Sequence, residues 1–444
     1  MTRIKYALCG ILIALLGSWS LADTWVPEPF TYFSFRRAFV QVTGVLAIGA
    51  MSIAMLLALR PRWLEKPLDG LDKMYRLHKW LGITALVSGV LHWWFALGTK
   101  WMVGWGWLER PVRTARSEEY GVLRQWLNSQ RDLADTLGEW GFYIAAIMIA
   151  LALIHRFPYR LFGQTHRWIA LIYLALAFHS LVRVRFEYWS QPVGWITAVL
   201  LVLGCVAACI SLFRRIGATR KVEGRIGELT HFPRLDVLQT RIEVPADWPG
   251  HAPGQFAFVT YDSREGAHPY TIASAWNPAE PSLTFIIKAL GDHTRRLKAL
   301  LKPGQSVMIE GPYGCFDFED DRSRQIWIGA GIGITPFIAR MQDRAAGRHR
   351  DIDVTLFHPT AVFEQPAIER LEADARAAGI ELHVLTDQHD GRLDGARIRQ
   401  LVPDWEQASI WFCGPAAFGR SLRADFIAHG LPARHFHQEL FQMR

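Results

Sequence analysis

Hydrophobic and polar positions follow different patterns in the two halves of the chain. Residues 1–216 contain six apolar runs, and an α-helix needs about 20 mainly apolar residues to cross a bilayer. We therefore predict a membrane α-helical bundle in this half. The predicted spans are Ile4–Ala22, Ala38–Leu59, Leu77–Leu97, Trp140–Ile154, Arg167–Val182 and Val193–Phe213.

Residues 217–320 contain short segments in which apolar and polar positions alternate, with glycine and proline between them. This pattern is typical of a small antiparallel β-barrel. The predicted strands are Lys221–Thr230, Leu235–Val244, Gln255–Tyr261, Leu283–Leu290 and Ser306–Glu310.

Residues 321–444 change the pattern again, because buried-type strands alternate with helical segments. This alternation predicts an α/β domain with a parallel sheet. The predicted strands are Gln325–Ile328, Asp353–Phe357, Glu381–Leu385 and Ser409–Phe412. The predicted helices begin at Thr335 and lie near Gln365–Ala378 and Ala396–Leu401.

Basic residues cluster at the ends of the predicted spans. The short loops between spans two and three and between spans four and five, and the segment after span six, are rich in Lys and Arg, which places both bundle ends on the cytoplasmic side. The long loop Gly98–Glu139 also carries several basic residues yet must lie outside. Its tryptophans fit an interfacial belt, and Tyr120–Leu137 fits an amphipathic helix on the outer surface.

The first apolar run allows two interpretations. Ile4–Ala22 is either a signal peptide with a weak cleavage site at Ser20-Leu21-Ala22 or a retained first helix, which we favour. Both interpretations leave the following segment starting outside.

Charge and cysteine content exclude several classes of protein. The net charge of +8 is scattered along the chain and forms no reader helix or basic-aromatic strip, so we expect no nucleic-acid partner. The five cysteines contain no CxxC pair or close run, which argues against structural zinc, cysteine-ligated iron–sulfur clusters and a disulfide framework.

Two of the predicted spans each carry a pair of histidines. His78 and His92 are fourteen residues apart, and His166 and His179 are thirteen apart, so each pair extends roughly 20 Å along a helix. Histidine inside a span usually marks function, and neutral imidazole is a good haem ligand. The pairs therefore predict two stacked haems, one near each face of the membrane.

The spacing of thirteen leaves a geometric problem and open alternatives. His166 and His179 would lie about 140° apart around a regular helix, which predicts a π-bulge, a kink or an irregular first turn near His166. The simpler alternative to haem ligation is that the four histidines are unrelated and form hydrogen bonds to the backbone or to water. His155, near the inner face, competes with His166 as inner ligand.

Several short motifs in the second half fit a flavin and a nucleotide. The Gly-rich turn Gly329–Pro336 follows a strand and opens a helix, as pyrophosphate-binding turns do. His268–Ser274 places an aromatic ring beside a hydroxyl, which suits an isoalloxazine. Gly291–Thr294 precedes a helix that could hold the flavin pyrophosphate, and Gly311–Gly314 is expected to be a tight turn. Cys413–Pro415 ends a parallel strand and should face the cofactor crevice.

In this order, the histidine pairs and the motifs resemble the NADPH oxidase and ferric reductase superfamily, in particular its compact bacterial members. The resemblance implies a transmembrane bis-haem domain over 1–216, an FAD-binding barrel over 217–320 and an NAD(P)H-binding α/β domain over 321–444. It also implies two b-type haems, FAD and NADPH or NADH as cofactors. The implied metal ligands are His78 with His166 for the inner haem and His92 with His179 for the outer haem.

The same resemblance assigns the remaining site residues. The expected catalytic residues are Cys413, near the nicotinamide, and Phe441, as the aromatic cover of the flavin. The expected cofactor-binding residues are His268, Pro269, Tyr270, Thr271, Ser274, Gly291, Asp292, His293, Thr294, Gly329, Gly331, Gly333, Thr335, Pro336, Cys413, Gly414 and Pro415.

Two departures from the superfamily pattern matter. Members that prefer NADPH often carry an Arg just after the second strand of this domain, whereas Phe357–Ala361 has none, so the choice between NADPH and NADH stays open. Arg36, Arg37, Arg183 and Arg185 lie at the outer ends of spans, where they could pair with haem propionates or simply anchor the interface.

The predicted function is electron transfer from cytoplasmic NAD(P)H, through FAD and the haems, to an acceptor outside a bacterial inner membrane. O2, giving superoxide, is the first choice of acceptor, and a ferric chelate is the alternative. A membrane quinone or cytochrome partner is a further alternative, and a haem carrier or channel without turnover is the rival from another class.

Overall fold

The computed structural model describes residues 2–109, 121–154 and 159–439. The chain divides into two compact units, one of Met1–Asp69 and Lys73–Ile216 and one of Gly70–Asp72 and Gly217–Met443. The units correspond to a helical half and a half that contains the sheets, and each is described by itself.

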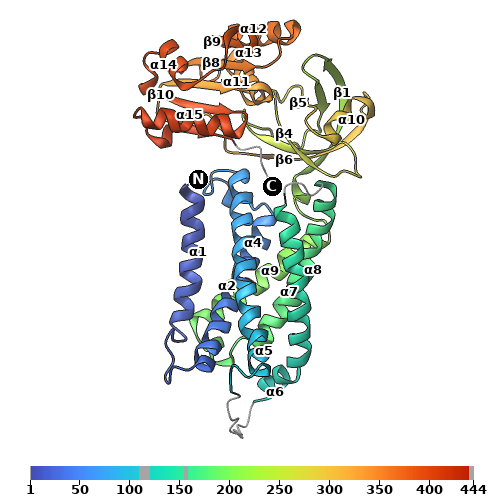
Figure 1. Ribbon diagram of the computed structural model, residues 1–444. Helices are drawn as coiled ribbons and strands as arrows, with labels where there is room; N and C mark the ends of the chain where they lie inside the picture. The colour runs from blue at the N-terminus through green and yellow to red at the C-terminus, as the bar shows by residue number, and fades with distance from the viewer. Residues whose placement is uncertain (1, 110–120, 155–158, 440–444) are drawn as a thin grey trace. The chain divides into compact units, whose positions relative to one another are not determined.

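In the described residues of the first unit, six helices are long and apolar enough to cross a membrane. Figure 1 shows them side by side in a bundle. The predicted helical class of this half is therefore confirmed. The long helices are α1 (Thr2–Ser20), α2 (Tyr32–Ala58), α4 (Leu71–Trp93), α7 (Arg131–Leu153), α8 (Tyr159–Arg183) and α9 (Pro192–Leu212).

The helix starts differ from the predicted ones because local hydrogen bonds and small residues extend them. α2 begins at Tyr32 rather than Ala38, since Thr31 and Ser34 form a reciprocal capping box. α7 begins at Arg131 rather than Trp140, so the predicted amphipathic segment is split between α6 (Val122–Ser129) and α7. The buried small residues Ala134, Gly138, Gly141 and Ala145 give α7 a smooth face, which packs against α8.

The predicted irregularity near His166 is wrong for the described residues. α8 is a continuous α-helix from Tyr159 to Arg183. The irregular turn lies instead on the other histidine helix, where the π-helix η1 (Trp94–Gly98) follows α4 and leads into α5 (Thr99–Gly104). Arg36 satisfies carbonyls there, donating to Phe95 O at 2.6 Å and Ala96 O at 2.9 Å.

The second unit begins with an antiparallel barrel whose strands follow the order β4-β3-β6-β1-β2-β5. A bridge between Ile272 and Phe285 joins the two end strands and closes the sheet. Alternating burial along β5 places Leu283, Phe285 and Ile287 in the barrel core. The strands are β1 (Lys221–Phe232), β2 (Val237–Glu243), β3 (Phe256–Thr260), β4 (His268–Thr271), β5 (Ser282–Lys288) and β6 (Ser306–Tyr313), and the helix α10 (Asp292–Leu300) follows β5.

The tight turn predicted over Gly311–Gly314 is wrong. β6 stays extended through Tyr313, which pairs with Phe256 of β3. The ladder between β3 and β6 shifts register between Phe256 and Phe258, and Pro312 lies at this bulge, where no ladder N–H is required.

The rest of the second unit is a parallel sheet in the order β11-β10-β7-β8-β9. One apolar core lies under α11 and α12 and another under α14 and α15, so helices cover both faces. The predicted α/β class is confirmed, although the sequence missed α15 and β11. The elements are β7 (Arg324–Gly329), α11 (Thr335–Ala345), β8 (Asp353–Thr360), α12 (Gln365–Ala378), β9 (Glu381–Thr386), α13 (Asp387–Asp390), α14 (Gly395–Leu401), β10 (Ala408–Cys413), α15 (Ala416–Ala428) and β11 (Phe436–Gln438).

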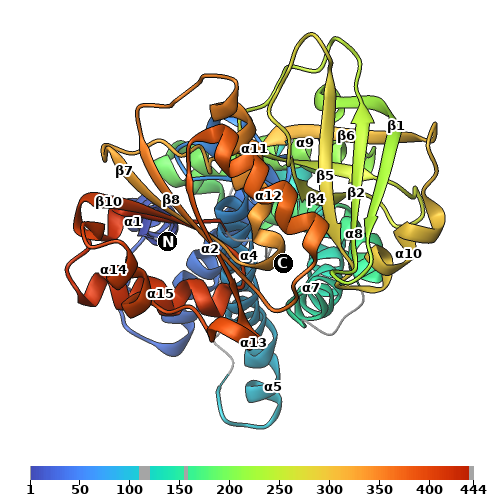
Figure 2. The ribbon, with the colours of Figure 1, turned by 90° about the horizontal axis from the view of Figure 1, so that it is seen from above.

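β7 is the switch point of the sheet: from β7 the chain first adds β8 and β9 on one side, and then crosses to add β10 and β11 on the other side. Open parallel sheets bind ligands in the crevice at the carboxyl ends of strands at such a switch point. Figure 2 shows β7, β8 and β10 together with their helices, and the barrel strands β1, β2 and β6 on the other side of this unit. The switch point therefore marks where a nucleotide is expected.

Candidate functional site

The four span histidines meet in two pairs within the first unit. His78 of α4 faces His166 of α8 with 5.9 Å between ring centroids, and His92 faces His179 with 6.2 Å. A metal–imidazole bond is about 2.0–2.1 Å long, so rings on opposite sides of one ion have centroids about 6 Å apart. Both spacings fit bis-imidazole ligation, and no break in α8 is needed to bring both pairs together.

Backbone carbonyls orient three of these rings. The Nδ1 atoms of His78, His92 and His179 lie 2.9, 2.9 and 2.7 Å from the carbonyls of Ala54, Val40 and Ala134. A carbonyl accepts a hydrogen bond, so Nδ1 carries the proton and Nε2 keeps its lone pair. This is the arrangement that holds a histidine ready for a metal, and the donor set therefore fits haem iron.

Two glycines allow neighbouring helices to approach the outer pair. A Cβ at Gly44 of α2 would lie 3.2 Å from the His92 ring, and a Cβ at Gly138 of α7 would overlap the His179 ring. Sequence reasoning missed both glycines, because their partners are distant in sequence and glycine in a span has many other uses.

The arginines at the outer ends of the spans are mostly engaged with protein groups. Arg36 donates to the η1 carbonyls, Arg183 pairs with Asp135 at 3.0 Å, and Arg185 pairs with Asp23. These contacts favour the structural alternative for the three arginines.

The proposed flavin residues gather at the edge of the barrel. The rings of His268, on β4, and His293, on α10, are stacked with centroids 4.2 Å apart. Burial, and then the neighbouring His293, lowers the pKa of His268 to about 4, and burial lowers the pKa of His293. Thr271 Oγ1 and His293 Nε2 are buried and have no hydrogen-bond partner among the described residues. Such atoms fit a polar cofactor like FAD.

The other proposed flavin residues have varied surroundings. Tyr270 packs on Tyr261 with 5.8 Å between ring centroids. The Ser274 hydroxyl accepts the Thr284 N–H at 3.0 Å, so it already supports β5. Thr294 Oγ1 accepts the Gly291 N–H at 3.0 Å and fixes the start of α10, whose first residue is Asp292. A helix N-terminus favours a bound phosphate.

The Gly-rich turn and Cys413 lie side by side at the switch point. Ala330 N donates to Cys413 O at 2.9 Å, and a Cβ at Gly333 would overlap that carbonyl. Gly331 adopts a left-handed φ of 55°, which favours glycine. Burial raises the pKa of the Cys413 thiol, so this side chain is neutral. Its proposed role is therefore positional and not nucleophilic.

The proposed nucleotide residues Thr335 and Pro336 begin α11, and Gly414 and Pro415 lead into α15. Gly329 ends β7, where a Cβ would lie 2.9 Å from Ile334 Cα, so the turn packs tightly. These residues and Cys413 thus surround the carboxyl ends of β7 and β10. Phe441 and His155 lie outside the described residues.

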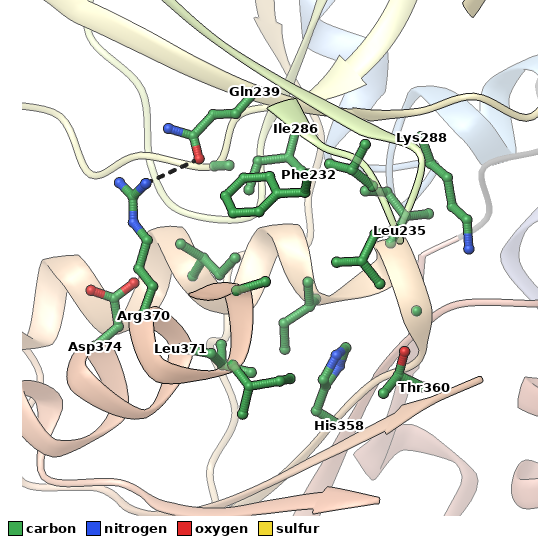
Figure 3. Close-up of a pocket in the computed structure, with 18 of the residues that line it drawn as sticks. Phe232, Leu235, Gln239, Ile286, Lys288, His358, Thr360, Arg370, Leu371 and Asp374 are labelled. Atoms are coloured by element: carbon green, nitrogen blue, oxygen red, sulfur yellow. Dashed lines mark hydrogen bonds between the residues drawn. The ribbon is translucent and has the colours of Figure 1, made fainter. Parts of the chain in front are cut away.

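A pocket of about 940 Å³ opens beside this turn, between the barrel and α12. Figure 3 shows apolar side chains, among them Phe232 and Ile286 from the barrel, facing Leu371 of α12. Arg370 donates to Gln239 at 3.3 Å at one end, and Lys288 and Thr360 lie at the other. Gly331 and His358 also line the pocket, so it is continuous with the proposed nucleotide site.

Comparison with known proteins assigns the two halves separately. Residues 43–177 match the family described as "Ferric reductase like transmembrane component", and residues 227–316 match the family described as "FAD-binding domain". Both matches support a place for the chain in the NADPH oxidase and ferric reductase superfamily.

Similar members of the superfamily come from bacteria, plants and amoebae. An NADPH oxidoreductase of Mycobacterium tuberculosis is 32% identical over 37% of this chain and 46% of its own length. A superoxide-generating NADPH oxidase heavy chain of Dictyostelium discoideum is 27% identical over 46% of this chain and 42% of its own length. Respiratory burst oxidase homolog protein E of Arabidopsis thaliana is 25% identical over 48% and 24%. The chain thus spans about half, or less, of the length of these relatives.

Proposed function

We propose that the chain transfers electrons across a membrane, from cytoplasmic NAD(P)H to an acceptor on the opposite side, with O2 reduced to superoxide. The observation that carries this proposal is the pairing of four histidines on two spans, with three of the rings oriented by backbone carbonyls. The families matched by the two halves add FAD and the transmembrane component.

Three segments of the chain would each bind a different cofactor. Residues 1–216 hold two b-type haems, with His78 and His166 on the inner haem and His92 and His179 on the outer one. Residues 217–320 hold FAD, and residues 321–444 hold NAD(P)H. When bound, FAD accepts a hydride and the haems carry its electrons singly.

The described residues perform the positioning. His268 and His293, whose pKa values are lowered by burial, would offer a stacked pair of neutral rings to the proposed flavin. Gly331 and Gly333 bring the backbone close to the nucleotide and to Cys413. The Cys413 thiol is buried in the apolar core, and Cys413 supports the Gly-rich turn through its backbone carbonyl, beside the proposed nicotinamide site. Phe441 is proposed to cover the flavin.

Bis-histidine ligation decides how an acceptor can react. Each pair of imidazoles would hold one iron from two helices, and an acceptor would then be reduced without binding the metal. One-electron reduction of O2 to superoxide needs no such bond. A ferric chelate is also reduced by one electron, and the match to a ferric reductase like component makes it the second candidate.

Purified full-length protein tests the function. We expect NAD(P)H consumption with O2 as sole acceptor, accompanied by cytochrome c reduction that superoxide dismutase inhibits. Faster NAD(P)H consumption with a ferric chelate under anaerobic conditions would favour the second candidate. Absence of turnover with either acceptor would contradict the proposed function.

A further inference from the structure

The nucleotide domain does not itself explain how the adenosine end of NAD(P)H is recognised. In dinucleotide-binding folds an Asp or Glu after the second strand binds the ribose 2′-hydroxyl, or an Arg nearby accommodates a 2′-phosphate. The second strand here is β8, and it ends in His358, Pro359 and Thr360, followed by Ala361. Neither an acid nor an arginine is present in this stretch.

A second hollow, of about 1110 Å³, lies at this position. Ala361 and Val362, after β8, form one wall, and Thr386 and His389, at the end of β9 and in α13, form another. Val362 also lines the pocket of Figure 3, so the two hollows adjoin. A dinucleotide that begins at Gly331 therefore has a path to this second hollow.

Arg234 reaches the second hollow from the barrel. It lies in the turn between β1 and β2, far in sequence from the other lining residues. Among the described residues that line the hollow, Arg234 is the one arginine and none is a carboxylate. The hollow thus offers a guanidinium to an anion and no acid to a ribose hydroxyl.

The turn that carries Arg234 is fixed to the nucleotide domain. Leu235 N donates to the buried Glu364 carboxylate at 3.0 Å, just before α12. Arg370 of α12 donates to Gln239 of β2 at 3.3 Å, as Figure 3 shows. The neighbouring carboxylate of Asp236 pairs with Lys298 at 3.6 Å. The turn that carries Arg234 is therefore fixed beside the hollow, and the carboxylates of Glu364 and Asp236 each have a partner.

We propose that Arg234 of the barrel binds the 2′-phosphate of NADPH and makes the chain prefer NADPH to NADH. Arginine is suited to this role because its planar guanidinium forms paired hydrogen bonds to phosphate. The inference rests on the proposed function, since it assigns a coenzyme to the same nucleotide site. It also explains why no arginine is needed after β8.

The test compares both coenzymes in the full-length holoenzyme, with ferricyanide as acceptor. We expect Arg234→Ala to raise the KM for NADPH about tenfold to a hundredfold, the usual cost of a hydrogen bond to a charged group. The KM for NADH should change by less than about twofold, and Arg234→Lys should restore part of the affinity, since lysine binds phosphate as a point charge. Inhibition by adenosine 2′,5′-bisphosphate should weaken in parallel.

Arg241→Ala is the matched control, because it removes an exposed arginine from the same barrel that pairs with Glu280 and does not line the hollow. It should leave both KM values unchanged. The inference would be overturned if the native protein used NADPH and NADH equally, or if Arg234→Ala affected both coenzymes equally. In either case, turnover with NADH would leave the proposed function standing. Absence of turnover with both coenzymes in the native protein would contradict the proposed function itself.

Discussion

At the scale of single residues, two glycines determine how closely helices approach the outer histidine pair. Gly44 and Gly138 lie against His92 and His179, where any larger side chain would contact the rings. The Val40 and Ala134 carbonyls one turn away orient the same rings. The same two helices, α2 and α7, therefore supply both the glycines that make room for these rings and the carbonyls that orient them.

Gly138→Ala should therefore displace the His179 ring. Overpacking a filled site costs about 1–3 kcal/mol, and we expect the haem content to fall from about two towards one per chain while FAD is retained. Gly10→Ala on α1 is the matched control, since a Cβ there has no neighbour within 4 Å. Haem and FAD assays on both purified variants check this prediction, and an unchanged haem content in Gly138→Ala would refute the role of the glycine.

His251 makes the stability of the second unit depend on pH. Burial lowers its pKa to about 4, although the hydrogen bond from Nε2 to Ser274 O, at 2.8 Å, raises it slightly. The unfolded chain has the usual pKa of about 6.5, so it binds a proton between pH 6.5 and pH 4 while the folded protein does not. Stability is therefore lost as the pH falls through this range.

We expect the temperature of FAD release from the full-length protein to fall between pH 7.5 and pH 5. His251→Gln should reduce this fall, because it removes one of the groups that protonate on unfolding. His429→Gln is the control, since His429 is the C-cap residue of α15 and its side chain is exposed. A pH profile of His251→Gln that is identical to the native profile would contradict this account.

The pairing of the four histidines could be predicted from the sequence, whereas the groups that support their rings could not. Spacing alone places His78, His92, His166 and His179 on two spans. Gly138 and Arg234, by contrast, lie near residues that are distant in the chain, so no local pattern distinguishes them from an ordinary helix glycine or turn arginine.

At the scale of elements, the segment that follows the C-terminal end of α1 is hydrogen-bonded to the loop before α9. Asp23 accepts hydrogen bonds from Arg185 and from the hydroxyl of Tyr188, and Trp19 Nε1 donates to that hydroxyl at 3.1 Å. Trp19 is buried together with Leu15 against α2 and Val193. α1 therefore packs as part of the bundle in the structure.

Asp23→Asn should weaken this connection. The half-buried Arg185 would lose its charged partner, which costs about 1–3 kcal/mol. Glu187→Gln, which breaks the more exposed pair with Arg124, is the control and should cost less than about 1 kcal/mol. Thermal unfolding of the purified variants in detergent checks this prediction, and equal midpoints for the two variants would contradict it.

Element types could be predicted more reliably than element ends. Continuous apolar runs identified the spans, and alternation identified the barrel strands. The starts of α2 and α7 could not be predicted, because a capping box and a small-residue face extend them beyond the apolar run. The short strand β11 was missed because its three residues show no period, and pairing with β10 defines it.

At the scale of the whole molecule, the two units would contribute different parts of the proposed electron path. The first unit contributes the imidazole pairs, and the second contributes a barrel and a parallel sheet whose switch point faces the proposed nucleotide. The chain order of these parts could be predicted, since each has its own hydrophobic period. The acceptor could not, because bis-histidine ligation suits any acceptor that takes one electron without binding the iron.

The reduced-minus-oxidised spectrum of the purified protein, recorded with its haem and FAD content, tests the central claim most directly. We expect a bis-histidine b-type spectrum with about two haems and one FAD per chain, and loss of one haem but not of FAD in His92→Leu. A protein without a Soret band after expression with ample haem, or two haems retained in His92→Leu, would contradict the account.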